Sequence, residues 1–188
     1  MTKKIDKTKI ERAIIDIFSA IGQDLCTPSL KDTPKRVANM YEEIFSGINS
    51  NPKDLITFFD EDFKEDIVIA KDISFFSMCE HHMIPFFGKV HICYMPSEGK
   101  LLGFSKLARL VEVFTKRPQI QERITSLLAD FLANEVCARG VAVIIEAEHM
   151  CMTMRGAKQV GSQIITTAFR GIIATDTALK TQALHLLK

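Results

Sequence analysis

Residues 67–95 read IVIAKDISFFSMCEHHMIPFFGKVHICYM, and apolar side chains recur with a period of two on both sides of a central break. That period predicts one β-strand at 67–78 and another at 87–95. The break at Cys79–His82, with Pro85 soon after it, indicates a sharp bend between them. The two strands therefore form an antiparallel hairpin, and residue types that bind metals lie at its turn.

Segments after this hairpin change to helical spacing and then return to strands. Apolar residues three and four apart predict a helix at 105–117 and a second that begins at Pro118 and ends by Gly140. Strands at 141–152 and about 161–170 follow. The order β-β-α-α-β-β predicts an α+β fold, in which a four-stranded antiparallel sheet carries the two central helices on one face.

Helices are also expected on both flanks of this unit. The spacing predicts them at 6–22, from Thr33–Pro34 to Gly47, and at about 177–187, with a connection at 48–64. We therefore expect an N-terminal helical region (1–64), a central domain (65–175) and a C-terminal helical tail (176–188). The second face and the edges of the sheet still need cover, which oligomerisation would provide.

Composition narrows the class of protein. The chain has 188 residues, 47% of them hydrophobic, and a net charge of +1 from 24 basic and 23 acidic residues. This balance argues against a nucleic-acid partner, because proteins that bind nucleic acids usually carry a strong excess of basic residues. No apolar run suggests a signal peptide or a membrane span, so we expect a cytoplasmic protein. Its five scattered cysteines are read as thiols or metal ligands, with Cys26, Cys93 and Cys137 as buried small residues.

Two short clusters carry metal chemistry. The first is the Cys-x-x-His spacing within Cys79–His82, and the second is His149-Met150-Cys151. On a strand, His149 and Cys151 would project to the same face. A catalytic zinc takes three protein ligands and leaves one position for water. The spacing alone offers five candidate ligands and does not separate them: Cys79, His81, His82, His149 and Cys151.

Other polar residues suit an anion and a nucleobase. Lys106 and Arg109 are neighbours on a helix that begins at Ser105, where free backbone N–H groups favour phosphate. Arg155 follows the second cluster closely. Glu122 stands in a first helical turn, where the helix dipole alone would explain it, although its carboxylate could also accept hydrogen bonds from a guanine edge. Basic residues on a helix face are, in the ordinary case, simply solvated.

Four stretches together resemble the GTP cyclohydrolase I family. They are DTPKRVANMYEEIFSG (32–47), SMCEHHMIPFFGKVHICYMP (77–96), GFSKLARLVEVFTKRPQIQERIT (103–125) and EAEHMCMTMRG (146–156). The resemblance implies the tunnelling fold, assembled into an oligomeric barrel. It implies conversion of GTP and water to 7,8-dihydroneopterin triphosphate and formate, the entry to folate or tetrahydrobiopterin synthesis. It also implies one Zn²⁺ per subunit and a homodecamer of two pentamers with sites between subunits.

The resemblance also assigns roles that spacing left open. It implies zinc ligation by Cys79, His82 and Cys151, with His81 and His149 as a non-ligating catalytic pair. Ser105 and Gln121 are expected beside them, Ser105 near the ribose-triphosphate and Gln121 at the guanine. It implies substrate binding by Glu122 at the guanine, by Lys106, Arg109 and Arg155 at the triphosphate, and by Arg36 in a neighbouring subunit's site.

Departures from the family pattern are few, and none falls on a proposed ligand. Cys93 stands where Gly is frequent, Phe104 where Leu is usual, and Arg170 where an apolar residue is common. Two alternatives remain from the sequence. One is a related tunnelling-fold enzyme, either a nitrile reductase or a pterin synthase. The other is a zinc-stabilised binding module without turnover.

Overall fold

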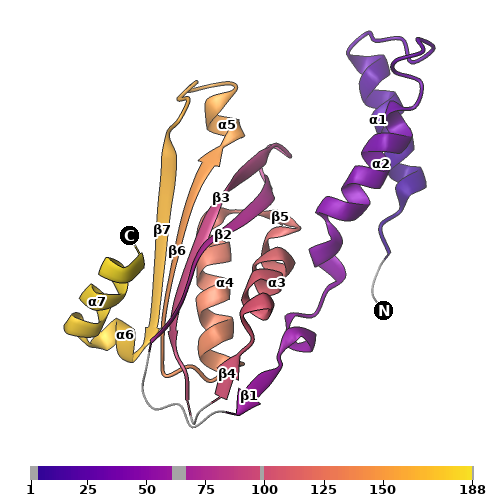
Figure 1. Ribbon diagram of the computed structural model, residues 1–188. Coiled ribbons are helices and arrows are strands. Elements are labelled where there is room, and N and C mark those ends of the chain that lie inside the picture. Colours follow the sequence, from indigo (N-terminus) through magenta and orange to yellow (C-terminus); the bar gives the residue numbers. More distant parts are fainter. Residues whose placement is uncertain (1–3, 61–66, 98–99, 188) are drawn as a thin grey trace.

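The computed structural model describes residues 4–60, 67–97 and 100–187, and a curled five-stranded sheet lies at its centre (Figure 1). The strands lie in the order β5-β2-β3-β6-β7. Their bounds are β2 (Val68–Cys79), β3 (Pro85–Met95), β5 (Pro118–Gln119), β6 (Gly140–His149) and β7 (Gln163–Gly171). The four long strands pair antiparallel, as predicted. The short β5 pairs parallel to β2, so the expectation of four strands, all antiparallel, is wrong at this edge.

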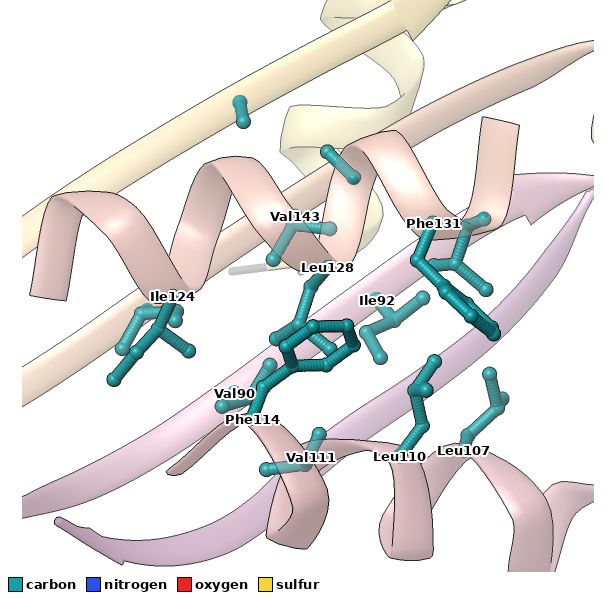
Figure 2. Close-up of a cluster of buried hydrophobic side chains, with 14 of the residues drawn as sticks. Val90, Ile92, Leu107, Leu110, Val111, Phe114, Ile124, Leu128, Phe131 and Val143 are labelled. Carbon is teal, nitrogen blue, oxygen red and sulfur yellow. The ribbon is translucent and has the colours of Figure 1, made fainter. Parts of the chain in front are cut away.

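Helices α3 (Phe104–Thr115) and α4 (Gln121–Asn134) lie side by side on one face of the sheet (Figure 1). Their apolar stripes meet the inward side chains of β3 and β6 in a single core (Figure 2). Burial of such side chains removes apolar surface from water and is the main stabilising term of the domain. The fully buried members include Val90, Ile92, Leu107, Val111, Ile124, Leu128 and Val143.

The opposite face of the sheet is partly covered by the C-terminal segment. Helices α6 (Ile172–Thr175) and α7 (Thr177–Leu187) follow β7 and turn back onto the sheet (Figure 1). Ala183 and Leu187 pack there in a cluster that includes Cys93. Burial raises the pKa of the Cys93 thiol to about 11, so this departure from the family pattern is an inert core residue.

Three segments differ from the sequence prediction. Pro118 does not start a helix; it is the first residue of β5, and α4 begins at Gln121. A proline is tolerated in a short edge strand because the N–H it lacks is not needed there. The expected connection at 48–64 contains two 3₁₀ turns (Ser46–Asn49 and Pro52–Leu55) and β1 (Phe58–Asp60), which pairs with β4 (Lys100–Leu102). The expected strand 141–152 ends at His149, where α5 (Met150–Thr153) begins.

Helices α1 (Lys7–Ala20) and α2 (Thr33–Ile44) form a hairpin that stands away from the sheet (Figure 1). An ion pair of 2.8 Å joins Lys7 to Glu42 across it. No residue of α1 is buried, and Ile17 is 52% exposed. The domain boundary expected at residues 64–65 lies outside the described residues, so the three-part division stays a prediction.

Other outcomes concern single residues. Cys26 and Cys137 are exposed, so the prediction that they are buried was wrong; Cys26 lies in a turn and Cys137 in the connection after α4, outside the core elements. Arg170 packs against α4, where its Nε donates to Asp130 Oδ1 at 2.6 Å. Phe104 is 73% exposed and takes no part in the core. Among the described helices, none combines the length and the apolar character that a membrane crossing requires.

Gly88 controls how closely β3 approaches β6. A Cβ at this position would lie 1.9 Å from the carbonyl oxygen of Glu146 and 2.7 Å from Cα of Ala147, both backbone atoms of β6. We expect Gly88→Ala to lower the free energy of unfolding by about 3 kcal/mol or more, because the overlap is with backbone atoms and the strands must separate. Urea denaturation measures the change.

Gly161→Ala is the matched control. A methyl group added at Gly161 would meet nothing within 4 Å, but this residue has a φ of +77°, so only backbone strain of about 1 kcal/mol is expected. Equal losses for the two variants would show that the close contact at Gly88 is unimportant.

Candidate metal centre and catalytic cleft

The first part of the centre is the turn between β2 and β3. The N–H of Cys79 donates to the carbonyl of Ile84 at 2.9 Å, and the N–H of Met83 donates back to the carbonyl of Cys79 at 2.8 Å. Met83 has a φ of +52°, which lets the chain reverse within a few residues. This closed turn places Cys79 Sγ 3.6 Å from His82 Nδ1.

The second part comes from the end of β6. His149 closes that strand, and the first turn of α5 carries Cys151. The sequence argument placed both residues on one face of a continuous strand, which is wrong, because the chain turns helical at Met150. Cys151 still reaches the first part of the centre: its ligand atom and those of Cys79 and His82 all lie within 4.8 Å of one another.

The chemistry of these three side chains fits a metal ion. Two thiols and one imidazole are a common donor set for tetrahedral zinc. The pKa of the Cys151 thiol is raised by burial and by the neighbouring Cys79 thiol, since two thiolates in contact repel each other. A divalent cation between them would remove this penalty, because metal binding favours the deprotonated thiols. Within the described residues, Cys79, His82 and Cys151 form the one group of three or more Cys, His, Asp or Glu side chains that could share a metal ion.

His149 is held from two sides. Its ring stacks on Phe86, with 4.6 Å between ring centroids and 6° between planes. Its Nε2 lies 2.8 Å from Gln121 Oε1. Burial lowers the pKa of His149, against an opposing effect of the Glu122 carboxylate, so the neutral ring is favoured at neutral pH.

Gln121 determines which nitrogen of His149 carries the proton. Its Nε2 donates to the carbonyls of Ile145 and Ile164, each at 2.9 Å, and lies 3.1 Å from Thr166 Oγ1. Carbonyls only accept hydrogen bonds, so this end of the side chain is the NH₂ group. The end facing His149 is then the oxygen, and His149 must donate from Nε2. Nδ1 of the neutral ring therefore has a free lone pair.

A cleft of about 440 Å³ opens over these residues. Glu122 and Arg155 line it together with His81, His149 and the three candidate ligands. The side chain of His81 is 65% exposed, and its Nε2 lies 3.8 Å from Glu80 Oε1. Arg155 donates from Nη1 to the carbonyl of Cys151 at 3.3 Å. The predicted metal-binding and guanine-binding residues thus meet in one place, although Gln121 is 1% exposed and its side chain is fully engaged.

Four predicted substrate residues lie outside this cleft. Ser105, Lys106 and Arg109 belong to the first turns of α3, which starts beside β4 at the end of the sheet away from α5 (Figure 1). Lys106 faces Leu55, Ile56 and Phe131 there. Arg36 lies on α2 in the separate hairpin, 3.9 Å from Asp32. These four residues therefore lie apart from the metal centre of their own chain: three are at the far end of α3, and Arg36 is on the separate hairpin.

Several residues of the site were not found from the sequence. No role was assigned from the sequence to Phe86, Glu80 or Arg123, and Phe86 fell outside the strand predicted at 87–95. Yet Phe86 stacks on His149, and Arg123 binds Glu80 through both terminal nitrogens. For Glu80 and Arg123 the one available signal was their position inside the motifs CEHH and QER; Phe86 lies in neither motif.

Comparison with known proteins gives a consistent result. The profile of a family described as GTP cyclohydrolase I matches residues 10–188. GTP cyclohydrolase 1 of Halalkalibacterium halodurans is 54% identical over 98% of both chains. That of Carboxydothermus hydrogenoformans is 53% identical over 97% of this chain and 95% of its own, and that of Bacillus subtilis 50% over 99% and 98%.

A solved structure is a more distant match. The archaeosine synthase QueF-Like in the apo form aligns with a TM-score of 0.48 at 17% identity, over 58% of this chain and 97% of that one. This likeness is too low to support a conclusion.

Gln121 should contribute to stability through its buried bonds. We expect Gln121→Met, which is close in size, to lower the free energy of unfolding by about 1–3 kcal/mol, because it leaves two carbonyls without their side-chain donor. Urea denaturation measures this value. Gln159→Met is the control: the side chain of Gln159 is exposed and donates to the nearby Ala157 carbonyl, so a change within about 0.5 kcal/mol is expected. Similar values for both would contradict the network.

Proposed function

The chain belongs to the GTP cyclohydrolase I family and is an enzyme that acts on GTP, and we propose that its cleft converts GTP and water to 7,8-dihydroneopterin triphosphate and formate. One observation carries this proposal. The candidate metal ligands, His149, Glu122 and Arg155 share a single cleft of about 440 Å³. A metal group, a proton-transfer group, a nucleobase acceptor and a phosphate-binding cation are therefore present together.

We propose Cys79, His82 and Cys151 as the ligands of one zinc ion, on the strength of their donor types and spacing. Zinc bound by three protein ligands lowers the pKa of a coordinated water to about 7 and so supplies hydroxide at neutral pH. His81 remains outside this set, with a mostly exposed ring that can exchange protons with solvent.

His149 is proposed as the group that moves a proton to the purine. Its Nε2–H is engaged with Gln121, so proton transfer takes place at Nδ1. The Phe86 stack fixes the ring plane, so Nδ1 keeps one direction. His149 would accept a proton at Nδ1 from the water that is consumed and donate it to N7 of the purine as the five-membered ring of the base opens. Such help from a positioned group is typically worth about 10²–10⁴-fold in rate.

Recognition of GTP is assigned to charged side chains. Glu122 is exposed at the start of α4 and lines the cleft, so its carboxylate can accept from the N–H groups of the guanine edge. Arg155 supplies a cation beside the ligand Cys151 and suits the triphosphate. Gln121 supports this site through His149 and the β6–β7 carbonyls.

The remaining substrate residues are proposed to act across subunits. Ser105, Lys106, Arg109 and Arg36 lie away from the cleft of their own chain, so a neighbour is the source of the triphosphate cations that this cleft lacks. Oligomeric assembly follows from the family, and we propose a homodecamer of two pentamers. Exposed apolar side chains at Ile15 and Ile17 of α1 and at Ile21, the residue that follows the helix, support burial of the hairpin by partners. The cytoplasmic location and the folate or biopterin pathway stay predictions.

Activity and metal dependence test the function together. Purified protein incubated with GTP should release formate and yield a pteridine that fluoresces after oxidation. Chelation should abolish turnover, and added zinc should restore it, because the proposed chemistry needs hydroxide at neutral pH. Folded, zinc-loaded protein that releases no formate would leave the non-catalytic binding module as the better account.

Cys151→Ala tests the ligand set. We expect zinc affinity to fall by at least about 100-fold, since even residues that only support a ligand cost about 10–100-fold when replaced. Zinc per chain is measured after dialysis against a chelator. Cys137→Ala is the control, because Cys137 is exposed and belongs to no metal group among the described residues. Unchanged zinc content in Cys151→Ala removes Cys151 from the ligands.

A further inference from the structure

The segment 119–123 contacts both parts of the metal centre, which come from positions about 70 residues apart in the sequence. On one side, Gln121 binds His149 and the carbonyls of Ile145 and Ile164, next to the second part. On the other side, Arg123 contacts the turn of the first part. These contacts suggest that the start of α4 holds the two parts together.

Arg123 binds the β2–β3 turn, which is the first part of the metal centre, through the carboxylate of Glu80. Its Nη1 donates to Glu80 Oε2 at 2.5 Å, and its Nη2 donates to Glu80 Oε1 at 3.1 Å. Glu80 directly follows the candidate ligand Cys79. A fork of two parallel bonds fixes the relative orientation of the two groups as well as their distance.

Backbone contacts surround this fork. The N–H of Glu80 donates to the carbonyl of Gln119 at 3.1 Å, and β5 pairs with Met78 and Cys79. Arg123 Nη1 also lies 3.3 Å from Gln119 Oε1. The turn that carries Cys79 and His82 is thus attached to the residues that immediately precede Glu122.

The solvent exposure of Glu80 and Arg123 indicates that their two-bond contact fixes the geometry of the site more than it stabilises the fold. The side chains of Glu80 and Arg123 are 29% and 45% exposed. Ion pairs this open to water contribute little to folding free energy. An orientation fixed by two bonds, by contrast, persists in water as long as both bonds are made.

We propose that Arg123 is a positioning residue for the reaction: through Glu80 it fixes the Cys79–His82 turn against the first turn of α4, so that the metal ligands and the guanine acceptor Glu122 keep a constant separation. This inference rests on the proposed function of the cleft. Its chemical reason is that C8 of the purine must meet the metal centre while the other end of the base is held by Glu122. A small change in that separation costs rate, even when binding survives.

The test compares Arg123→Lys, Glu80→Gln and the double variant. Arg123→Lys keeps the charge and loses the fork. We expect kcat to fall by roughly 10–100-fold in each single variant, with a much smaller change in KM for GTP. The double variant should lose no more than a single one, because both act through one contact.

Cobalt gives a readout independent of turnover. Co²⁺ substituted for zinc has visible bands that report ligand geometry, and these should shift in Arg123→Lys, with weaker metal retention against a chelator. The control is Arg170→Lys, which alters a second Arg–carboxylate contact of α4, to Asp130, away from the cleft. It should leave kcat and the cobalt spectrum unchanged.

Three results would overturn the proposal. Wild-type kcat in Arg123→Lys would show that the fork is dispensable. Additive losses in the double variant would show that Glu80 acts separately, through its contact with His81. Lost activity with an unaltered cobalt spectrum would place Arg123 directly at the substrate. If the wild type releases no formate, the proposed function fails, while the spectrum and metal affinity of the variants still test the fork.

Discussion

The pairing of β3 with β6 is the constraint on which the geometry of the candidate metal centre depends. Ten residue pairs set its register, from Phe86 opposite His149 to Met95 opposite Gly140. A slip of one residue would send every side chain of a strand to the other face of the sheet. The β2–β3 turn and the start of α5 are the two ends that this register brings together. The stack of Phe86 on His149 is the last cross-strand pair before the metal ligands.

Much of this arrangement follows from local patterns in the sequence. Apolar spacing identified α2, α3, α7 and the four long strands, because each buries part of its surface; it also identified α1, whose apolar stripe is not buried within this chain. The motifs also indicated the metal group, since Cys and His cluster twice within a few residues. The family resemblance then separated His82 from His81 and His149, which spacing could not do. The ligand atoms of Cys79, His82 and Cys151 lie within 4.8 Å of one another and could hold one metal ion, while the roles of the three histidines stay a prediction.

Other features depend on contacts between distant segments and left no local signal. The short β5 exists because Cys79 and Met78 offer it a partner, and Pro118 alone suggested a helix start. Cys151 reaches the centre from a helical turn, which a period-two argument could not anticipate. Gln121 looked like a nucleobase contact by its position beside Glu122, whereas its buried amide is engaged with carbonyls of β6 and β7.

The detached α1–α2 hairpin has a consequence for how the protein matures. The sheet and its helices complete a core within one chain, whereas α1 contacts α2 and buries no residue of its own. Under the proposed assembly, enclosure of the hairpin and supply of the second set of cations depend on encounters between chains. A chain that has not met its partners would then lack a complete substrate site. The cell would then set the amount of competent enzyme through abundance as well as through synthesis, because assembly responds steeply to concentration.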